Sequence, residues 1–305
     1  MSLASIPVDL FNPGQVFGCL GFMEAAIELC GSARATYDWS DPRQSRFHLD
    51  VPGDANGFET VLRFLAEATV SSQAPFSEPD LATEKWNVDT VRPDPAPASG
   101  RYRFPIAVPS SPATLPAVLR TSAHAISLYH WGDTTQRDNV KFWAGSGGYP
   151  GAAFLRDALD LIRARLLDCA DDPFAVSASQ PSSFRFDWRR DYIPMDVGFS
   201  LNAHSHIVPL GYPIVEIMAA IGLTHARPLR PKRQNKLHYR YAVIGRADAA
   251  CPTEESLLPP ALLRATLGGL VKMPFATRRF EMSLGWPGQE NQARCITNVI
   301  EETVK

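Results

Sequence analysis

Residues 217–247 read IMAAIGLTHARPLRPKRQNKLHYRYAVIGRA, and they combine an apolar segment, a basic loop and a segment of alternating polarity. The apolar segment continues a run that begins at residue 213, and its length and composition are typical of a short buried helix. After the loop, Tyr239, Tyr241 and Val243 alternate with polar residues, which is the period-two pattern of a strand. We therefore expect the basic loop to be held between a buried helix and a strand.

The same stretch has an unusual charge balance. It contains no Asp or Glu, and its seven Lys and Arg residues leave a net charge of −9 on the rest of a chain whose total is −2. These like charges repel one another, and a nucleic-acid backbone would offset the repulsion. The alternative is that the cations are solvated or pair with acidic residues distant in sequence. The residues of this stretch that we predict to bind nucleic acid are Arg227, Arg230, Lys232, Arg233, Lys236 and Arg240.

Residues 184–190, FRFDWRR, are a second candidate for the same interface. Aromatic and charged residues alternate in this segment, which predicts a strand followed by Arg189 and Arg190. Strand aromatics beside arginine can stack on bases, so both arginines are candidate nucleic-acid contacts. The alternative interpretation is that the aromatic side chains belong to the hydrophobic core.

Helix and strand patterns are interspersed along the rest of the chain. Asn12 is a suitable N-cap for a helix that ends at Gly31, and Asn56 is a suitable N-cap for a second helix. Alternating polarity at residues 46–51 and 278–286 is typical of strands. The long parallel-strand pattern of a doubly wound fold is missing. The sequence therefore predicts an α+β fold with mixed antiparallel sheets and packed helices.

Glycines share one face of the first predicted helix, at Gly14, Gly18 and Gly21. Glycine has no side chain, so a second backbone can approach such a face closely. One interpretation is that a partner protein docks on this face, which would make the chain a structural adaptor.

A proline-rich segment divides the chain. Residues 71–100 lack periodicity and end in RPDPAPASG, which is typical of a linker or long loop. This predicts an N-terminal α/β region at residues 1–92 and a main α+β nucleic-acid-binding region at residues 101–305. A single domain is the alternative for a chain of 305 residues.

Composition favours a cytoplasmic protein. No run approaches the roughly 18 apolar residues of a membrane span, and the N-terminus has no signal-peptide pattern. The five cysteines are scattered and form no CxxC pair, which argues against a disulfide framework and a cysteine-rich zinc site.

The most enzyme-like segment is NAHSH at residues 202–206. His204 and His206 would share one face of a strand and could bind a metal, with Asp196 as a third ligand. A metal-dependent nuclease or hydrolase is therefore the enzymatic alternative. However, the chain has no HExxH motif and no nucleophile elbow. We predict no catalytic residue, no metal and no cofactor.

Three segments resemble a CRISPR-associated family of the type I-U systems, now called I-G, whose members are Csb-type or large-subunit-like proteins. The segments are FNPGQVFGCLGFME at residues 11–24, GYPIVEIMAAIGL at residues 211–223 and FEMSLGWPG at residues 280–288. The resemblance implies a subunit of a Cascade surveillance complex in antiviral defence. Its implied partners are guide RNA, target DNA, the other Cascade subunits and a recruited helicase-nuclease that cuts the DNA.

Two roles in such a complex fit the resemblance. A large subunit recognises the short motif that flanks the target and steadies the displaced strand. At 305 residues the chain is short for a large subunit, so a backbone or guide-end subunit with an RRM-like, ferredoxin-like core is the alternative. The family suggests no particular base-reading residue. The predicted contacts therefore depend on the charge pattern alone.

Overall fold

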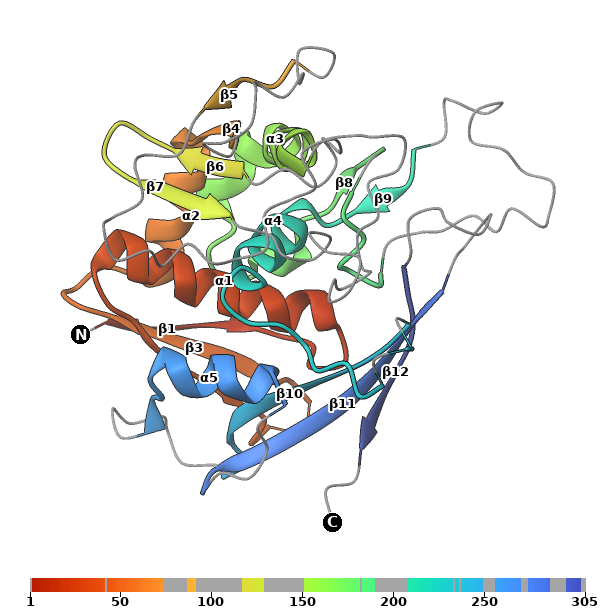
Figure 1. Ribbon diagram of the computed structural model, residues 1–305. Coiled ribbons are helices and arrows are strands. Elements are labelled where there is room, and N and C mark those ends of the chain that lie inside the picture. The colour runs from red at the N-terminus through yellow and green to blue at the C-terminus, as the bar shows by residue number, and fades with distance from the viewer. Residues whose placement is uncertain are drawn as a thin grey trace, which may run out of the picture.

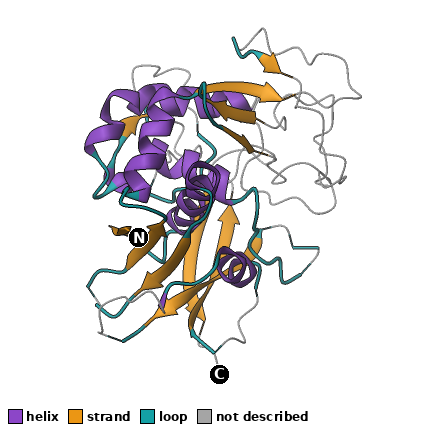
Figure 2. Ribbon diagram, turned by 90° about the vertical axis from the view of Figure 1, so that its left-hand side faces the viewer, coloured by secondary structure: helices purple, strands orange, loops and turns teal. Residues whose placement is uncertain are grey.

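A computed structural model of the chain has the α+β fold that the sequence predicts, with helices packed against mixed sheets (Figures 1 and 2). The structure describes residues 2–41, 43–73, 87–91, 117–128, 151–181, 183–189, 208–232, 234–235, 237–248, 256–269, 274–285 and 295–302.

Helix α1 (Pro13–Cys30) has the start predicted from the sequence. The Asn12 side chain accepts a hydrogen bond of 3.1 Å from the backbone N–H of Gly14, which satisfies a donor at the open end of the helix. The Gln15 side chain does not close a capping box on Asn12. It accepts a hydrogen bond of 2.7 Å from the backbone N–H of Asp9 and so ties the preceding segment to the first turn.

A six-stranded sheet supports one side of α1 (Figures 1 and 2). Neighbouring strands are antiparallel except β2 (Arg34–Asp38) and β10 (His238–Arg246), which pair in parallel. Leu258, just before helix α5 (Pro260–Leu267), exchanges backbone hydrogen bonds of 2.9 and 3.1 Å with Ala35. In spatial order the strands are β1 (Ser2–Pro7), β3 (Arg46–Val51), β2 (Arg34–Asp38), β10 (His238–Arg246), β11 (Ala276–Gly285) and β12 (Cys295–Glu302).

A second layer lies on the opposite side of α1, and α4 (Pro213–Gly222) separates part of it from α1 (Figure 1). A four-stranded sheet contains, in order, β5 (Thr90–Val91), β4 (Thr69–Gln73), β6 (Ala117–Arg120) and β7 (Ala125–Leu128). The other elements of this layer are α2 (Gly57–Glu67), α3 (Gly151–Ile162), 3₁₀ helices at Arg163–Asp168 and Pro173–Ala175, and a pair of short strands, β8 (Ala178–Ser179) and β9 (Leu210–Gly211).

The start of the chain follows part of the ferredoxin-like pattern. The elements β1, α1, β2, β3 and α2 occur in the order βαββα, and their strands pair in the antiparallel order β1-β3-β2. The next strand, β4, does not join β1. It pairs with β5 and β6 in the second sheet, while β10 extends the first sheet beside β2. In the six-stranded sheet, β1, β3 and β2 therefore follow the ferredoxin-like order. The other three strands, β10, β11 and β12, come from the end of the chain.

The six-stranded and four-stranded sheets each combine strands from both predicted regions of the chain. In the six-stranded sheet β2 pairs with β10, and in the four-stranded sheet β4 pairs with β6. One continuous hydrophobic core includes residues from both regions. The proline-rich segment at residues 92–100 lies outside the described residues.

The glycine-lined face of α1 packs against the chain's own helix α4. A Cβ added at Gly21 would overlap the backbone oxygen of Met218, and a Cβ at Gly222 would overlap the backbone oxygen of Phe17. The other two glycines of the predicted face also lie against residues of the same chain. The interpretation that a partner protein docks on this face is therefore wrong, because α4 and its neighbouring segments already cover it.

The predicted strand at residues 184–188 is also wrong, because this segment is irregular. The buried carboxylate of Glu216 accepts hydrogen bonds of 3.0 and 3.1 Å from the backbone N–H groups of Phe186 and Asp187. These donors are therefore satisfied by a side chain and not by a neighbouring strand. Phe184 and Phe186 are 3% and 0% exposed, so they belong to the core, which was the alternative interpretation.

Candidate functional site

The basic loop is held as the sequence predicts. It follows the buried helix α4 and precedes strand β10. Its middle is fixed because Leu229 and Arg240 exchange two backbone hydrogen bonds of 2.7 Å, which add a one-residue bridge to the edge of β10. The loop backbone is therefore attached to strand β10 at Leu229 as well as at the end of the loop.

The cations of the loop differ in exposure. Arg227 and Lys232 are exposed, whereas Arg230 is half-buried. Arg233 and Lys236 lie outside the described residues. Among the predicted contacts of this loop that the structure describes, Arg227 and Lys232 are therefore the most accessible to a ligand.

Arg240 pairs with acidic residues that are distant in sequence. Its Nε atom lies 2.5 Å from the carboxylate of Glu302, and its guanidinium lies 3.5 Å from the carboxylate of Glu281. Glu281 comes from β11, which lies beside β10 in the sheet, and Glu302 comes from β12, the next strand beyond β11. The alternative considered for the basic run, pairing with remote acids, therefore applies at this position.

The tyrosines that flank Arg240 face the core. Tyr239 and Tyr241 are 1% and 0% exposed. The Tyr241 hydroxyl donates a hydrogen bond of 2.8 Å to the backbone oxygen of Leu10, and its ring stacks on Phe280 with centroids 5.1 Å apart. Burial raises the pKa of Tyr241 well above its ordinary value, because the phenolate form would lose its hydration. Neither ring is placed to stack on a base.

Arg189 is held by three different groups of the same chain. Its guanidinium lies 2.6 Å from the Asp187 carboxylate, donates a hydrogen bond of 2.8 Å to the backbone oxygen of Phe174, and lies 3.6 Å from the centre of the Tyr212 ring. Arg190 lies outside the described residues. The geometry gives Arg189 a structural role that the charge pattern did not indicate.

A buried polar network connects this arginine to the helices. The Asn12 side chain donates a hydrogen bond of 3.0 Å to the Asp187 carboxylate, while the backbone N–H of Asp187 donates to Glu216 on α4. Asn12, Asp187 and Glu216 are 0%, 0% and 1% exposed. The network therefore links the cap of α1 to α4 through the segment that ends in Arg189. The Asn12 cap was predictable from the sequence, but this network was not.

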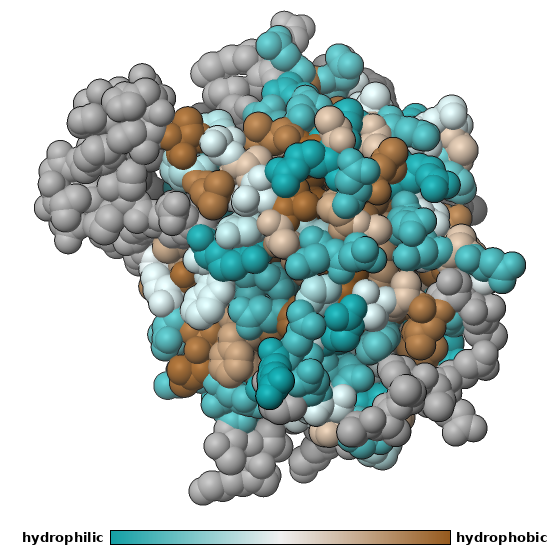
Figure 3. Space-filling view, turned by 180° about the vertical axis from the view of Figure 1, so that it is seen from behind, coloured by the Kyte–Doolittle hydropathy of each residue, from teal (hydrophilic) through white to brown (hydrophobic). Residues whose placement is uncertain are grey.

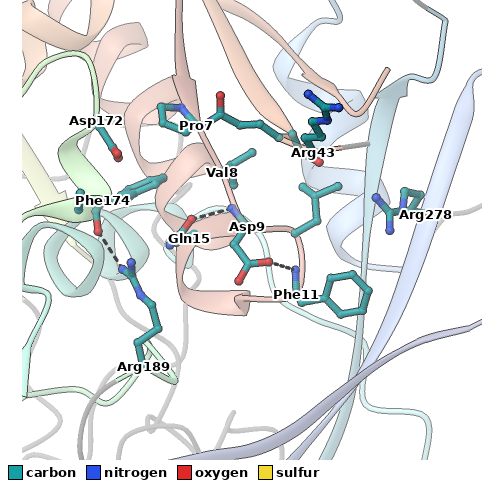
Figure 4. Close-up of a pocket in the computed structure, with 14 residues that line it drawn as sticks. Pro7, Val8, Asp9, Phe11, Gln15, Arg43, Asp172, Phe174, Arg189 and Arg278 are labelled. Carbon is teal, nitrogen blue, oxygen red and sulfur yellow. Dashed lines mark hydrogen bonds between the residues drawn. The ribbon is translucent and has the colours of Figure 1, made fainter. Parts of the chain in front are cut away.

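A cavity of about 450 Å³ lies beside the network, at the start of α1 (Figure 4). Figure 4 shows Asp172, Phe174 and Arg189 on one side, Phe11 and Arg278 on the other, and Asp9 and Gln15 between them. Five separate parts of the chain supply its lining, which consists of Pro7, Val8, Asp9, Leu10, Phe11, Gln15, Arg43, Gln44, Ser45, Asp172, Phe174, Ala175, Arg189 and Arg278.

Two arginines of this cavity, Arg43 and Arg278, were not identified from the sequence. Arg278 donates two hydrogen bonds of 2.7 Å to the Glu301 carboxylate. These bonds raise the pKa of Arg278 and lower the pKa of Glu301, because each charged form stabilises the other. The Arg278 guanidinium also lies 5.8 Å from the centre of the Phe11 ring, within the range of a cation–π contact. Arg43 is exposed.

The candidate metal ligands of the enzymatic alternative, His204, His206 and Asp196, lie outside the described residues. Within the described segments, no group of three or more His, Cys, Asp or Glu side chains is placed to hold a metal ion. No helix in the described part of the chain is both long enough and apolar enough to cross a membrane.

The face of the molecule opposite to Figure 1 is mixed in polarity. Among the residues coloured in Figure 3, hydrophobic side chains form separate small groups between polar ones. This face therefore adds no large hydrophobic patch, among the coloured residues, to the basic loop and the cavity.

Comparison with known proteins found no matching family model, no similar curated protein and no similar solved structure.

Proposed function

We propose that this chain is a non-catalytic subunit of a type I CRISPR RNA-guided surveillance complex, and that it binds guide RNA or target DNA through the basic loop at residues 223–237. Its expected partners are the other Cascade subunits and the helicase-nuclease that such a complex recruits. In this proposal the recruited enzyme cuts the DNA, and this chain contributes binding.

The proposal depends chiefly on the exposure of cations on a fixed loop. Arg227 and Lys232 are exposed, and Leu229 between them is hydrogen-bonded to Arg240 of strand β10. A loop that is already fixed loses less conformational entropy when its side chains meet a ligand. Lysine and arginine contacts with phosphates would supply affinity, while base pairing by the guide would supply sequence specificity.

The three segments that carry the family resemblance also support the proposal. They correspond to the start of α1, to α4 and to the second half of β11. Gly21 packs against the backbone of Met218, and the rings of Phe11 and Phe280 meet edge to face at 5.1 Å. The segments are therefore packing motifs of one core. Motifs of this kind preserve a fold without a catalytic signature, as a binding subunit requires.

The test is a salt titration of binding to a guide-length RNA, with the double variant Arg227→Glu/Lys232→Glu. If both side chains contact phosphates, the slope of log K against log salt should fall by about 1.4, because each contact on a single strand contributes about 0.7. Arg63→Glu, at an exposed position on α2, is the matched control and should leave the slope unchanged. An unaltered slope in the double variant would exclude this loop as the phosphate contact.

The same titration with duplex DNA distinguishes the two roles. Stronger binding of RNA favours a backbone or guide-end subunit, whereas stronger binding of duplex DNA favours a large subunit that recognises the flanking motif. Binding of neither would contradict the proposal for the isolated chain. Circular dichroism of each variant confirms that the fold is retained.

A further inference from the structure

We infer that the cavity at the start of α1 binds a single nucleotide, with the base beside Phe11 and the phosphate at Arg43. The cavity is distinct from the basic loop, so this inference does not require the proposed contacts of Arg227 and Lys232. Its volume of about 450 Å³ lies within the usual range of small-molecule sites, which is roughly 300–1,000 Å³.

The floor of the cavity carries a hydrogen-bond acceptor, the Asp9 carboxylate, beside a hydrogen-bond donor, the Gln15 amide. The Asp9 carboxylate accepts one hydrogen bond, of 2.9 Å, from the backbone N–H of Phe11, and Asp9 is otherwise exposed. Gln15 is only 5% exposed, and its oxygen accepts a hydrogen bond from the backbone N–H of Asp9. The Gln15 amide nitrogen has no hydrogen-bond partner among the described residues, although the residue lines the cavity. This nitrogen is not among the atoms shut off from solvent, so it is open to the cavity and can donate a hydrogen bond to an acceptor on a ligand.

The side of the cavity offers an aromatic surface for a base. Phe11 is 36% exposed, although its ring is held against Phe280 by an edge-to-face contact at 5.1 Å. The Arg278 guanidinium lies 5.8 Å from the same ring and is itself fixed by Glu301. Aromatic rings and arginine planes are the groups on which unpaired bases stack in proteins. The ring is therefore both fixed and accessible.

The cation for a phosphate is Arg43. Its backbone N–H donates a hydrogen bond of 2.8 Å to the Asp41 carboxylate, which orders the turn, while its side chain is exposed. No described carboxylate forms an ion pair with Arg43, in contrast to Arg189 and Arg278, whose charges are already neutralised. Arginine is well suited to phosphate because its planar donors match two oxygens at once.

The combination of groups selects the ligand class. An inorganic anion would use Arg43 alone and would leave the Phe11 ring without a contact. A purely apolar ligand would leave the Gln15 amide unsatisfied. A nucleotide carries an aromatic ring, adjacent donors and acceptors on its base edge, and a phosphate, so it can meet all of these groups together.

The experiment is calorimetric titration of the full chain with each of the four nucleoside monophosphates and, separately, with inorganic phosphate. At least one nucleotide should bind more tightly than inorganic phosphate. Phe11→Ala should weaken its binding by roughly 5- to 150-fold, as expected for one lost stacking contact. Arg43→Ala should abolish the preference for the nucleotide over the corresponding nucleoside.

Two matched variants serve as controls. Leu167→Ala removes an exposed apolar side chain and Arg63→Ala removes an exposed cation, both outside the cavity. Both should bind nucleotide as the unmodified chain does. Equal binding of nucleotide and inorganic phosphate, or nucleotide binding that is unaffected by Phe11→Ala, would overturn the inference. The inference would also be overturned if the chain bound none of the four mononucleotides and no tetranucleotide.

A short oligonucleotide identifies the source of the nucleotide. If a tetranucleotide binds more tightly than the monophosphate and Phe11→Ala weakens both, the cavity accepts a base from a strand; if only the monophosphate binds, the ligand is a free nucleotide. Arg227→Ala/Lys232→Ala should leave monophosphate binding unchanged. Conversely, Phe11→Ala should leave the salt slope for long RNA unchanged. Failure at the cavity is thereby separated from failure at the basic loop.

Discussion

Arg189 neutralises a carboxylate that has no access to water. The Asp187 side chain is 0% exposed, and an ionised group in such a position costs several kcal/mol unless it is paired and hydrogen-bonded. Asn12 also donates a hydrogen bond to this carboxylate. Asp187 therefore joins the cap of α1 to Arg189. We therefore expect the contribution of Arg189 to stability to exceed any contribution to nucleic-acid binding.

Replacement of this arginine should reveal its structural role. Arg189→Ala leaves the Asp187 charge buried without its cation, so the free energy of unfolding should fall by about 3 kcal/mol. Urea denaturation followed by circular dichroism measures the change. Adding Asp187→Asn should recover part of the loss, because no buried charge then remains. Arg63→Ala, at an exposed position on α2, should change stability by less than about 0.5 kcal/mol. Equal stabilities of Arg189→Ala and the unmodified protein would contradict the structural role.

At the scale of elements, the close contact of α1 and α4 depends on glycine. Gly21→Ala places a Cβ against the backbone oxygen of Met218, which cannot move without shifting α4. We expect a loss of about 3 kcal/mol in the free energy of unfolding, at the upper end of overpacking costs. Gly268→Ala is the matched control, since its φ is −71° and the nearest atom to its Cβ lies 3.4 Å away. A similar small effect of both substitutions, measured by urea denaturation, would show that α1 and α4 separate easily.

Elements with a local cause were predictable from the sequence, and elements with a remote cause were not. The start of α1 follows from Asn12, whose side chain acts two residues away. Residues 184–188 alternate in polarity like a strand, yet their backbone donors bind Glu216 on α4. The first half of strand β10 alternates as predicted, because one of its faces packs on the core, whereas residues 241–245 are all buried. Periodicity therefore identifies a buried face but not the group that satisfies a backbone.

At the scale of the whole molecule, the basic loop could be predicted from the sequence, whereas the cavity could not. The basic loop is continuous in sequence, so its charge was visible before its geometry. The cavity was not predictable, because Arg43, Arg189 and Arg278 come from distant parts of the chain and no spacing connects them. Arg240 shows the limit of the charge argument, since its acidic partners are supplied by β11 and β12. The sequence therefore identifies candidate cations, but only the structure shows which acidic residues pair with them.

The mixed origin of both sheets leads to a prediction about the halves of the chain. A fragment of residues 1–92 would contain α1 without α4 and β2 without β10, which are the neighbours that cover its glycine-lined face and its sheet edge. Exposed apolar surface costs about 25 cal/mol per Å², so we expect this fragment alone to lack a cooperative thermal transition in circular dichroism. Co-expression with residues 101–305 should restore the transition and give a stable complex of the two fragments. A fragment of residues 1–92 that melts cooperatively on its own would mean that the first three strands and two helices form an independent domain, and that the pairing of β2 with β10 only docks it.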